Sequence, residues 1–237
     1  MAKVLVIPDT HLKPKMFDLA DRIMRENDVD YAVQLGDNVD DFYCFDEQYR
    51  NHYARMLAFY RKHPDTVWLW GNHEVSYVSD RPVTGNVYAG KEYAYLYREN
   101  FNPKSVHLDG KVVFSHAGIF QEFLEANGLL ECGTAEELVE RINGMDLSAF
   151  WRDDSPLWAR PQYNEFVWPS VLNGYWQVIG HTPMKDIVEI GGLISVDAFS
   201  TNWGKKLGIE KMIIIDTEKL AFKVVDIDYR GEFGEEG

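Results

Sequence analysis

The stretch KVLVIPDTH, residues 3–11, decides the fold of this 237-residue chain. Its run of apolar and β-branched residues stops at polar Asp9 and His11, which is typical of a buried strand that runs into a loop. Two more runs end in the same way, and helical spacing separates the three: the runs are YAVQL at 31–35 and TVWLW at 66–70, and the helical segments are 16–27 and 43–63. Strands that alternate with helices predict a parallel sheet with right-handed crossovers.

The second half of the chain is expected to form a second, more antiparallel sheet. Residues 106–116, VHLDGKVVFSH, are typical of a hairpin that turns at Asp109-Gly110. TAEELVERING, 134–144, predicts a helix that Thr134 caps. Four further runs are typical of strands: 176–181, 193–197, 211–216 and 221–228. The simplest assembly is an α/β fold in which two sheets pack face to face with helices outside.

We expect one domain over residues 1–237, because no linker, repeat or low-complexity tract interrupts the chain. Residues 76–104 and 145–170 lack strong periodicity and are rich in Tyr, Trp, Asn, Arg and Pro. We therefore expect both segments to be loops or caps over the site. The acidic end, 231–237, is expected to be a frayed tail.

Composition excludes several classes of protein. Lys and Arg number 24 and Asp and Glu number 38, so the formal net charge is −14. Extended nucleic-acid binding is not expected, because it needs clustered cations. Cys44 and Cys132 are too few for a disulfide framework. The opening residues do not resemble a signal peptide, and no apolar run approaches the ~18 residues of a membrane span. We therefore expect a soluble cytoplasmic protein with no membrane partner.

Asp, His or Asn recurs at five strand-like endings: D-T-H at 9–11, G-D-N-V-D at 36–40, G-N-H-E at 71–74, S-H-A-G at 115–118 and G-H-T-P at 180–183. Turns at strand ends can aim such side chains at a common point. Carboxylate, imidazole and amide donors together suit divalent Mn, Fe, Zn or Ni. The two oxygens of Asp37 could bridge two ions about 3.5–4 Å apart. Two divalent ions with ionised Asp9 and Asp37 would give a local charge of +4 − 2 = +2, which favours a phosphorylated substrate.

In this order the motifs resemble those of the calcineurin-like metallophosphoesterase superfamily. They most resemble its phosphoprotein-phosphatase branch, with its small bacterial and phage members and the related dinucleoside-tetraphosphate hydrolases. The motifs run from residue 9 to residue 183, about three quarters of the chain. The resemblance implies a four-layer α/β/β/α double β-sandwich with the metal site at the carboxyl ends of the strands.

The resemblance also implies a role for each motif residue. One ion would be held by Asp9, His11 and Asp37, and the other by Asp37, Asn72, His116 and His181. His73 would be the general acid that protonates the leaving oxygen, and Asp40 would orient its imidazole. Pro183 stands where many phosphodiesterase-type relatives carry a second His, which favours the phosphatase branch. The cofactors would be two divalent ions, with Mn first and Fe, Zn or Ni as alternatives.

The implied activity is hydrolysis of phosphomonoesters by in-line attack of a metal-bound hydroxide, with serine/threonine protein phosphatase-like activity as one form. Asp41 is a departure, because the phosphatase branch carries a phosphate-binding Arg at this position. The alternative is therefore a phosphodiesterase, or a hydrolase of dinucleoside polyphosphates or nucleic-acid ends, that uses the same site. The substrate would be a phosphorylated small molecule, a nucleotide or a phosphopeptide. A non-catalytic binding module is disfavoured, because no motif ligand is missing.

SPLWAR, residues 155–160, resembles the P-L-W-x-R segment of the bacterial members, in which the Arg contacts phosphate. Arg160 is therefore the candidate for substrate binding, and Arg152 is a weaker one. The alternative for Arg160 is a salt bridge that holds the loop. Glu74 is expected to orient its loop rather than to bind metal. The remaining histidines have no motif around them and are interpreted as surface or packing residues: His52, His63 and His107.

Overall fold

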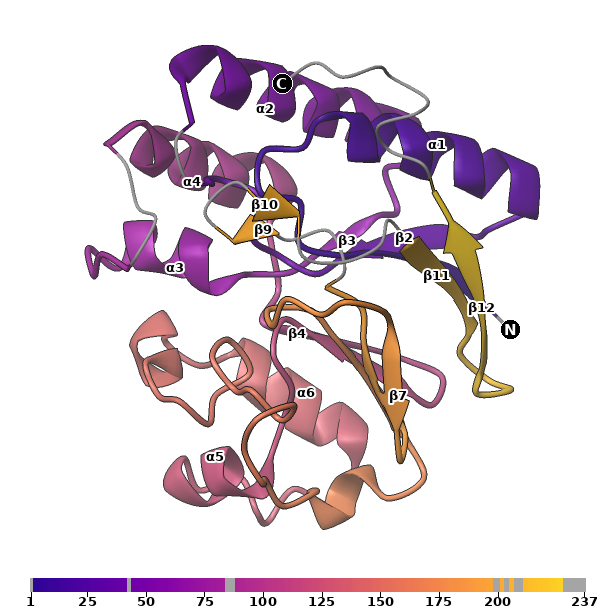
Figure 1. Cartoon of the computed structure of the whole chain (residues 1–237). Helices are drawn as coiled ribbons and strands as arrows, with labels where there is room; N and C mark the ends of the chain where they lie inside the picture. Colours follow the sequence, from indigo (N-terminus) through magenta and orange to yellow (C-terminus); the bar gives the residue numbers. More distant parts are fainter. Residues whose placement is uncertain are drawn as a thin grey trace.

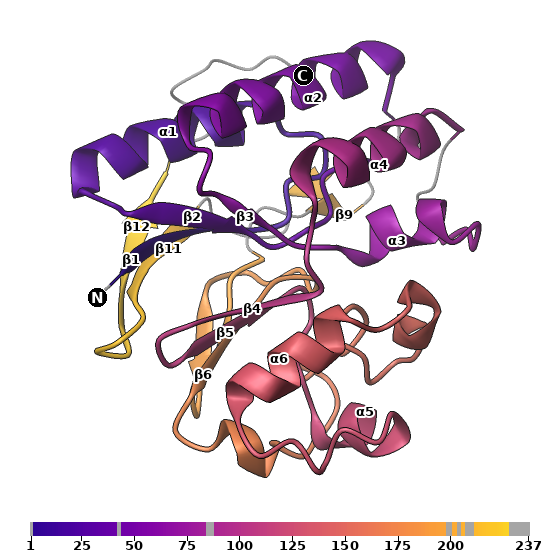
Figure 2. The ribbon, with the colours of Figure 1, turned by 180° about the vertical axis from the view of Figure 1, so that it is seen from behind.

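The computed structural model describes residues 2–41, 44–83, 88–197, 201–202, 205–206 and 211–227. Over these residues the chain forms four layers: helices, a five-stranded sheet, a second five-stranded sheet, and further helices (Figures 1 and 2). The predicted α/β/β/α double β-sandwich is therefore confirmed.

The first sheet has the strand order β12-β11-β1-β2-β3. Its strands are β1 (Lys3–Ile7), β2 (Tyr31–Gln34), β3 (Val67–Trp68), β11 (Lys211–Asp216) and β12 (Ala221–Asp226). The first three strands are parallel, as predicted, whereas β11 is antiparallel to β1 and β12 is antiparallel to β11. Three helices cover its outer face: α1 (Lys15–Asn27), α2 (Asp46–Lys62) and α4 (Tyr88–Phe101) (Figures 1 and 2).

The second sheet has the order β4-β5-β6-β8-β7. Its strands are β4 (Val106–Asp109), β5 (Val112–Ser115), β6 (Trp176–Ile179), β7 (Val188–Ile190) and β8 (Leu193–Ser195). The central strands β5, β6 and β8 are parallel, and β4 and β7 add antiparallel edges. Helices α5 (Gln121–Ala126) and α6 (Ala135–Asn143) lie on its outer side. The short strands β9 (Thr201–Asn202) and β10 (Lys205–Lys206) form a separate pair.

The side chains of β1 show how the layers hold together. Val4 and Val6 pack between the two sheets, and Leu5 and Ile7 pack against the helices. Because successive side chains of a strand point to opposite faces, a strand between two layers must be apolar throughout. All four side chains are fully buried, and each contributes about 1.5–3 kcal/mol of burial free energy. This packing fixes the strand end that carries Asp9.

The expected sheet assignment of residues 211–216 and 221–228 is wrong. We expected them in the second sheet, but β11 and β12 extend the first sheet beside β1. β11 is buried on both faces over Met212–Ile215. A strand of this pattern fits the centre of either sheet, so its sequence does not say which one it joins.

Of the two alternatives expected for residues 76–104, loops or caps, the loop alternative is wrong. Helix α3 (Asn72–Val78) enters this segment and α4 fills much of it. The buried face of α4 consists of Gly90, Ala94, Tyr97 and Phe101, which has helical spacing. Its first two residues are small, so the apolar periodicity is weak in the sequence. Glycine is needed at position 90 because α4 packs closely there on Tyr77 of α3.

Other local expectations agree with the structure. The hairpin β4–β5 turns at Asp109-Gly110, and Thr134 Oγ1 accepts the backbone N–H of Glu137 at 3.2 Å to cap α6. Residues 145–170 hold one short 3₁₀ helix, η1 (Leu147–Phe150), and otherwise turns and irregular chain; another, η2 (Ser170–Leu172), follows. The expected tail at 231–237 lies outside the described residues. Within the described ranges, no helix is both long and apolar enough to cross a membrane.

Candidate metal centre

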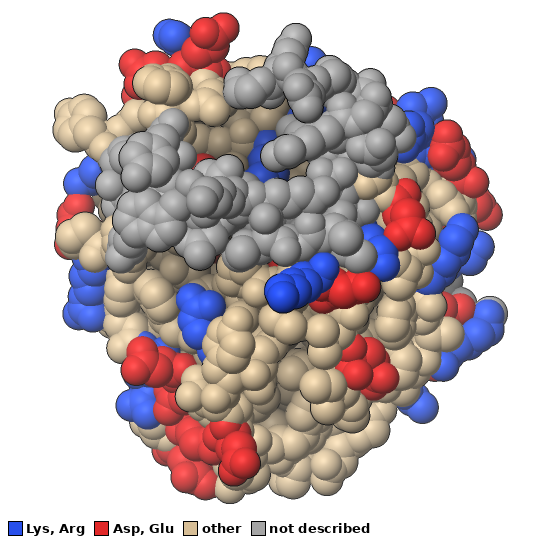
Figure 3. Space-filling model, viewed as in Figure 1, with Lys and Arg blue, Asp and Glu red and all other residues tan. Residues whose placement is uncertain are grey.

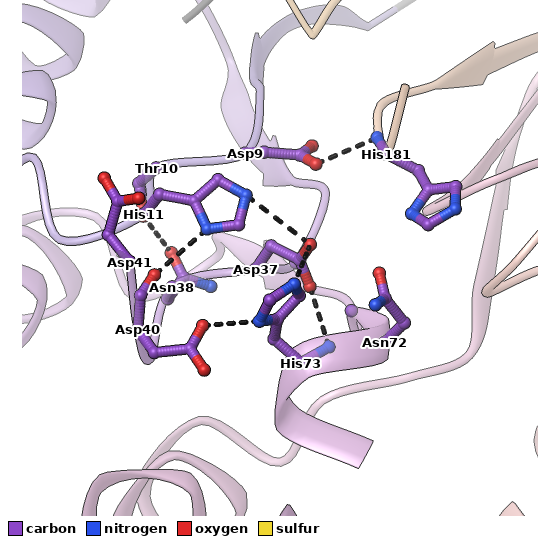
Figure 4. A network of polar contacts seen from close by, with 12 residues as sticks. Asp9, Thr10, His11, Asp37, Asn38, Asp40, Asp41, Asn72, His73 and His181 are labelled. Atoms are coloured by element: carbon purple, nitrogen blue, oxygen red, sulfur yellow. Dashed lines mark hydrogen bonds and ion pairs between the residues drawn. The ribbon is translucent and has the colours of Figure 1, made fainter. Parts of the chain in front are cut away.

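The candidate site lies where the carboxyl ends of strands from both sheets meet. β1, β2 and β3 of the first sheet lead into the motifs at 9–11, 36–40 and 71–74, and β5 and β6 of the second lead into His116 and His181. The backbones approach closely here: Gly36 has φ +102°, and a Cβ on it would lie 2.5 Å from the Gly71 nitrogen. Glycine is therefore required at this contact. Figure 4 shows the side chains of these loops converging.

Asp9, His11 and Asp37 form the first candidate ligand group, with one donor atom of each within 4.8 Å of the others. His11 Nδ1 donates to the Asp40 carbonyl oxygen at 3.0 Å, which leaves Nε2 to face the site. That Nε2 lies 3.6 Å from Asp37 Oδ2. Asp9 Oδ2 accepts the His181 backbone N–H at 2.9 Å, whereas its buried Oδ1 has no hydrogen-bond partner among the described residues.

Asp37, His116 and His181 form the second group, and Asn72 lies beside it. His116 Nδ1 donates to the Leu35 carbonyl oxygen at 2.8 Å, which leaves its Nε2 as an acceptor. The Nε2 atom lies 2.9 Å from Asn72 Oδ1, 3.1 Å from His181 Nδ1 and 3.5 Å from Asp37 Oδ2. The two groups share Asp37.

The donor atoms fit a bound cation. His116 Nε2 and Asn72 Oδ1 both present lone pairs at 2.9 Å, an arrangement that is repulsive unless a cation or a proton lies between them. Carboxylate oxygen, imidazole nitrogen and amide oxygen are a donor set for divalent transition metals. The residues present therefore fit divalent metal ions.

Electrostatics keep the ligands in the forms that bind metal. Burial acts to raise the pKa of Asp37, but the surrounding imidazoles, led by His116 and His73, hold it below its usual range. Burial also lowers the pKa of His116, and lowers that of His181 more strongly, which favours loss of the proton that would block metal binding. Asp9 differs, because burial and the charges of Asp197 and Asp37 raise its pKa. A cation beside Asp9 would offset this cost.

His73 and Asp40 form a close ion pair at the edge of the site. His73 Nδ1 lies 2.6 Å from Asp40 Oδ1, and His73 Nε2 lies 4.0 Å from Asp37 Oδ2. Burial acts to lower the pKa of His73, but the charges of Asp40 and Asp37 outweigh it and raise the pKa to about 10. The imidazole is therefore protonated, and its Nε2–H points toward the ligand groups (Figure 4).

Glu74 holds the strand-end loops together. Its carboxylate accepts backbone N–H groups from Asn38 at 2.5 Å, Asp37 at 2.9 Å and Gly71 at 3.0 Å. Burial, with the charge of Asp37, raises its pKa to about 7. This agrees with the expectation that Glu74 orients its loop rather than binding metal.

Arg160 lies on the wall of an open cavity of about 810 Å³ that Trp158 and Phe166 also line. Its guanidinium donates to Thr182 Oγ1 at 3.4 Å, and the Trp158 ring meets the His181 ring edge-on, with centroids 5.9 Å apart. Among the described residues no carboxylate pairs with Arg160, so the expected alternative of a salt bridge has no partner there. Arg152, by contrast, is held by both oxygens of Asp154 at 2.7 and 2.8 Å.

Asp41 lies at the position where the motif departs from the phosphatase pattern. Lys13 Nζ lies 3.7 Å from Asp41 Oδ2 and 3.5 Å from the Thr10 carbonyl oxygen. The carboxylate therefore has a cationic neighbour close to the first ligand group.

Two residues beside the site have contacts that sequence reasoning did not foresee. His52 is a buried packing residue, one of the two alternatives expected for it, and its Nε2 also lies 3.1 Å from Thr10 Oγ1, which in turn donates to Asn38 Oδ1 at 2.8 Å. Tyr77 donates its hydroxyl to Asp40 Oδ2 at 2.7 Å. His52 shares the buried face of α2 with Tyr49, Met56 and Phe59, and this helical spacing was the available signal. Tyr77 had none.

Comparison with known proteins identifies the family. The profile described as calcineurin-like phosphoesterase matches residues 2–205. The chain belongs to the calcineurin-like phosphoesterase family. It is therefore an enzyme that hydrolyses phosphoric esters with the help of metal. A search of curated proteins gives no match.

Solved structures share the fold of this chain. A cold-active protein-tyrosine phosphatase of the psychrophile Shewanella sp. aligns with a TM-score of 0.58 at 16% identity, covering 95% of this chain and 81% of that one. Hypothetical protein PH1004 from Pyrococcus horikoshii OT3 aligns with a TM-score of 0.51 at 9% identity, covering 97% and 89%. At these identities the likeness supports the fold of the calcineurin-like phosphoesterase and leaves its substrate open.

Proposed function

We propose that this calcineurin-like phosphoesterase is a dinuclear phosphomonoesterase. The observation that carries the proposal is the shared carboxylate: Asp37 belongs to both candidate ligand groups. One ion would be held by Asp9, His11 and Asp37, and the other by Asp37, Asn72, His116 and His181. When bound, two divalent cations supply the water activation and the neutralisation of phosphate charge that phosphoryl transfer needs.

The nature of the donors guides the choice of metal. Neither candidate group contains a thiolate, and mixed carboxylate, imidazole and amide donors suit Mn²⁺, Fe²⁺, Zn²⁺ and Ni²⁺. We favour Mn²⁺, with the other three as alternatives.

His73 would protonate the leaving oxygen. Its contact with Asp40 fixes Nδ1 as the bound nitrogen and leaves Nε2–H for the substrate. The raised pKa keeps this proton on the ring at neutral pH. Because an alkoxide leaves poorly without a proton, the acid matters most for alkyl phosphates.

The substrate would be a phosphorylated small molecule, a nucleotide or a phosphopeptide. Arg160 supports this, since it forms no ion pair among the described residues and lies beside the second ligand group. On the face shown in Figure 3, the Lys and Arg side chains of the described residues are scattered among Asp and Glu. That distribution favours a compact anionic substrate over extended nucleic acid.

A phosphodiesterase or a dinucleoside-polyphosphate hydrolase is the second candidate. Asp41 cannot donate to phosphate. The open cavity lined by Phe166 and by Trp158, whose ring contacts His181, has room for a second ester group. A panel of phosphopeptide, nitrophenyl phosphate, bis-nitrophenyl phosphate and diadenosine tetraphosphate in Mn²⁺ separates the two. The proposal expects higher kcat/KM on the monoesters, and the second candidate expects the reverse.

His73→Asn tests the proposed acid. We expect the variant to keep its metal ions, to lose about 10²-fold or more in kcat on an alkyl phosphate, and to change little on nitrophenyl phosphate, whose leaving group needs little protonation. The measurements are steady-state kinetics and metal content. Unchanged kcat on both substrates would remove His73 from the mechanism.

A further inference from the structure

Two side chains contact the carboxylate of Asp40, one at each oxygen. Oδ1 lies 2.6 Å from His73 Nδ1, and Oδ2 accepts the hydroxyl hydrogen of Tyr77 at 2.7 Å. The Asp40 side chain is fully buried, so water does not compete for either oxygen. The torsion that rotates an Asp carboxylate is broad and roughly two-fold. These two partners therefore help to set its rotation here.

The local structure explains why Tyr77 reaches Asp40. His73 and Tyr77 are four residues apart on α3, which places both side chains on one face of the helix, one turn apart. A carboxylate lying across that face can contact both.

Helix α4 holds the phenol ring in place. Tyr77 is 7% exposed, and Gly90 of α4 lies against it so closely that a methyl group there would overlap both Oη and Cζ. Figure 2 shows α3 and α4 side by side. The position of the hydroxyl is thus fixed by packing outside the site.

We propose that Tyr77 is a positioning residue for the acid step. Its hydroxyl holds the Asp40 carboxylate in the rotation that keeps the His73 ring aimed at the leaving oxygen. The inference rests on the proposed function of His73. Without the hydroxyl, Oδ2 would lose a partner in a buried site and the carboxylate could turn away from His73.

Tyr77→Phe tests the proposal. We expect kcat on an alkyl phosphate to fall about 10-fold, as is usual when an outer hydrogen bond to a site is removed, with less than about 2-fold change on nitrophenyl phosphate and unchanged metal content. Tyr53→Phe is the matched control, because it removes a hydroxyl that donates to the Leu96 carbonyl at 3.3 Å in the same helical layer. The control should leave both rates unchanged.

Coupling to His73 separates positioning from a general structural role. In the double variant with His73→Asn, Tyr77→Phe should cause no further loss, since the group it positions is absent. Gly90→Ala should reproduce the selective loss by displacing the phenol. Equal slowing of both substrates, loss of metal, or additive losses in the double variant would each overturn the proposal.

A spectroscopic readout does not depend on turnover. In Zn²⁺-loaded, ¹⁵N-histidine-labelled protein, the His73 Nδ1–H resonance should shift in Tyr77→Phe and stay in place in Tyr53→Phe. An unmoved resonance in Tyr77→Phe would contradict the proposed contact. If wild-type enzyme in Mn²⁺ hydrolysed neither substrate, the proposed function would fail, and this shift would still test whether Tyr77 positions the Asp40–His73 pair.

Discussion

At the scale of single residues, the buried His52 makes the stability of this protein depend on pH. It is 1% exposed and contacts Thr10 between two candidate ligands. Burial lowers its pKa from 6.5 to about 3. The unfolded chain therefore binds a proton at His52 below pH 6.5, whereas the folded chain binds it only near pH 3. The free energy of unfolding consequently falls as the pH drops through this window.

Replacing His52 should remove that part of the acid sensitivity. Between pH 6.5 and 4.5 the residue should cost wild type about 2–3 kcal/mol of unfolding free energy, at about 1.4 kcal/mol per pH unit. Urea unfolding of wild type and His52→Gln at pH 7 and pH 4.5 measures the difference. Equal losses of stability in the two proteins would show that His52 does not titrate in this way.

The candidate metal ligands stand in motifs that the sequence shows, whereas His52 and Tyr77 do not. Asp9, Asp37 and His116 each stand within two residues of the end of an apolar run, a position at which a strand end indicates a functional residue. His52 and Tyr77 have partners 42 and 37 residues away in the sequence. Neither sits in a motif, because only the tertiary fold brings them to Thr10 and Asp40.

At the scale of elements, the ends of the strands need glycine at close contacts so that the ligands can come together. Gly180 follows β6, its N–H donates to the His116 carbonyl at 2.8 Å, and a methyl group on it would overlap Asp9 Oδ1. Gly180→Ala should therefore displace a candidate ligand of the first ion while most of the core stays intact.

We expect Gly180→Ala to weaken Mn²⁺ binding by about 10-fold or more, a loss of the size seen when the support of a ligand is disturbed. Gly133→Ala is the control, since its methyl group would meet only Glu137 Oε2 at 3.8 Å. Titration calorimetry with Mn²⁺ measures both variants. Equal dissociation constants in the two variants would mean that the strand end tolerates a side chain.

Elements whose apolar and polar residues alternate with a clear period were predictable, and elements that lack such a pattern were not. The strands of the βαβ half and the capped helix α6 follow from local pattern. The buried face of α4 includes Gly90 and Ala94, whose small side chains give the sequence little apolar periodicity. β11 is apolar on both faces, so its pattern predicts a strand but leaves its neighbour undetermined.

At the scale of the whole molecule, the candidate site belongs to neither sheet alone. Asp9, His11 and Asp37 lie in loops that follow strands of the first sheet, Asn72 is the first residue of α3, and His116 and His181 follow strands of the second sheet. The His181 N–H donates to Asp9 across 172 residues of sequence. Stacking of the two sheets therefore brings the donor side chains together. The family resemblance predicted that these side chains converge, because it implies a fold in which the two sheets are stacked.

The central claim is that two metal ions share Asp37, and metal stoichiometry tests it most directly. Protein equilibrated with Mn²⁺ and freed of unbound metal should carry two ions per chain by elemental analysis. Asp37→Asn should lose both ions while its far-UV circular dichroism stays that of wild type, whereas His11→Asn should lose only one. Asp37→Asn that still held an ion with wild-type affinity would contradict the account.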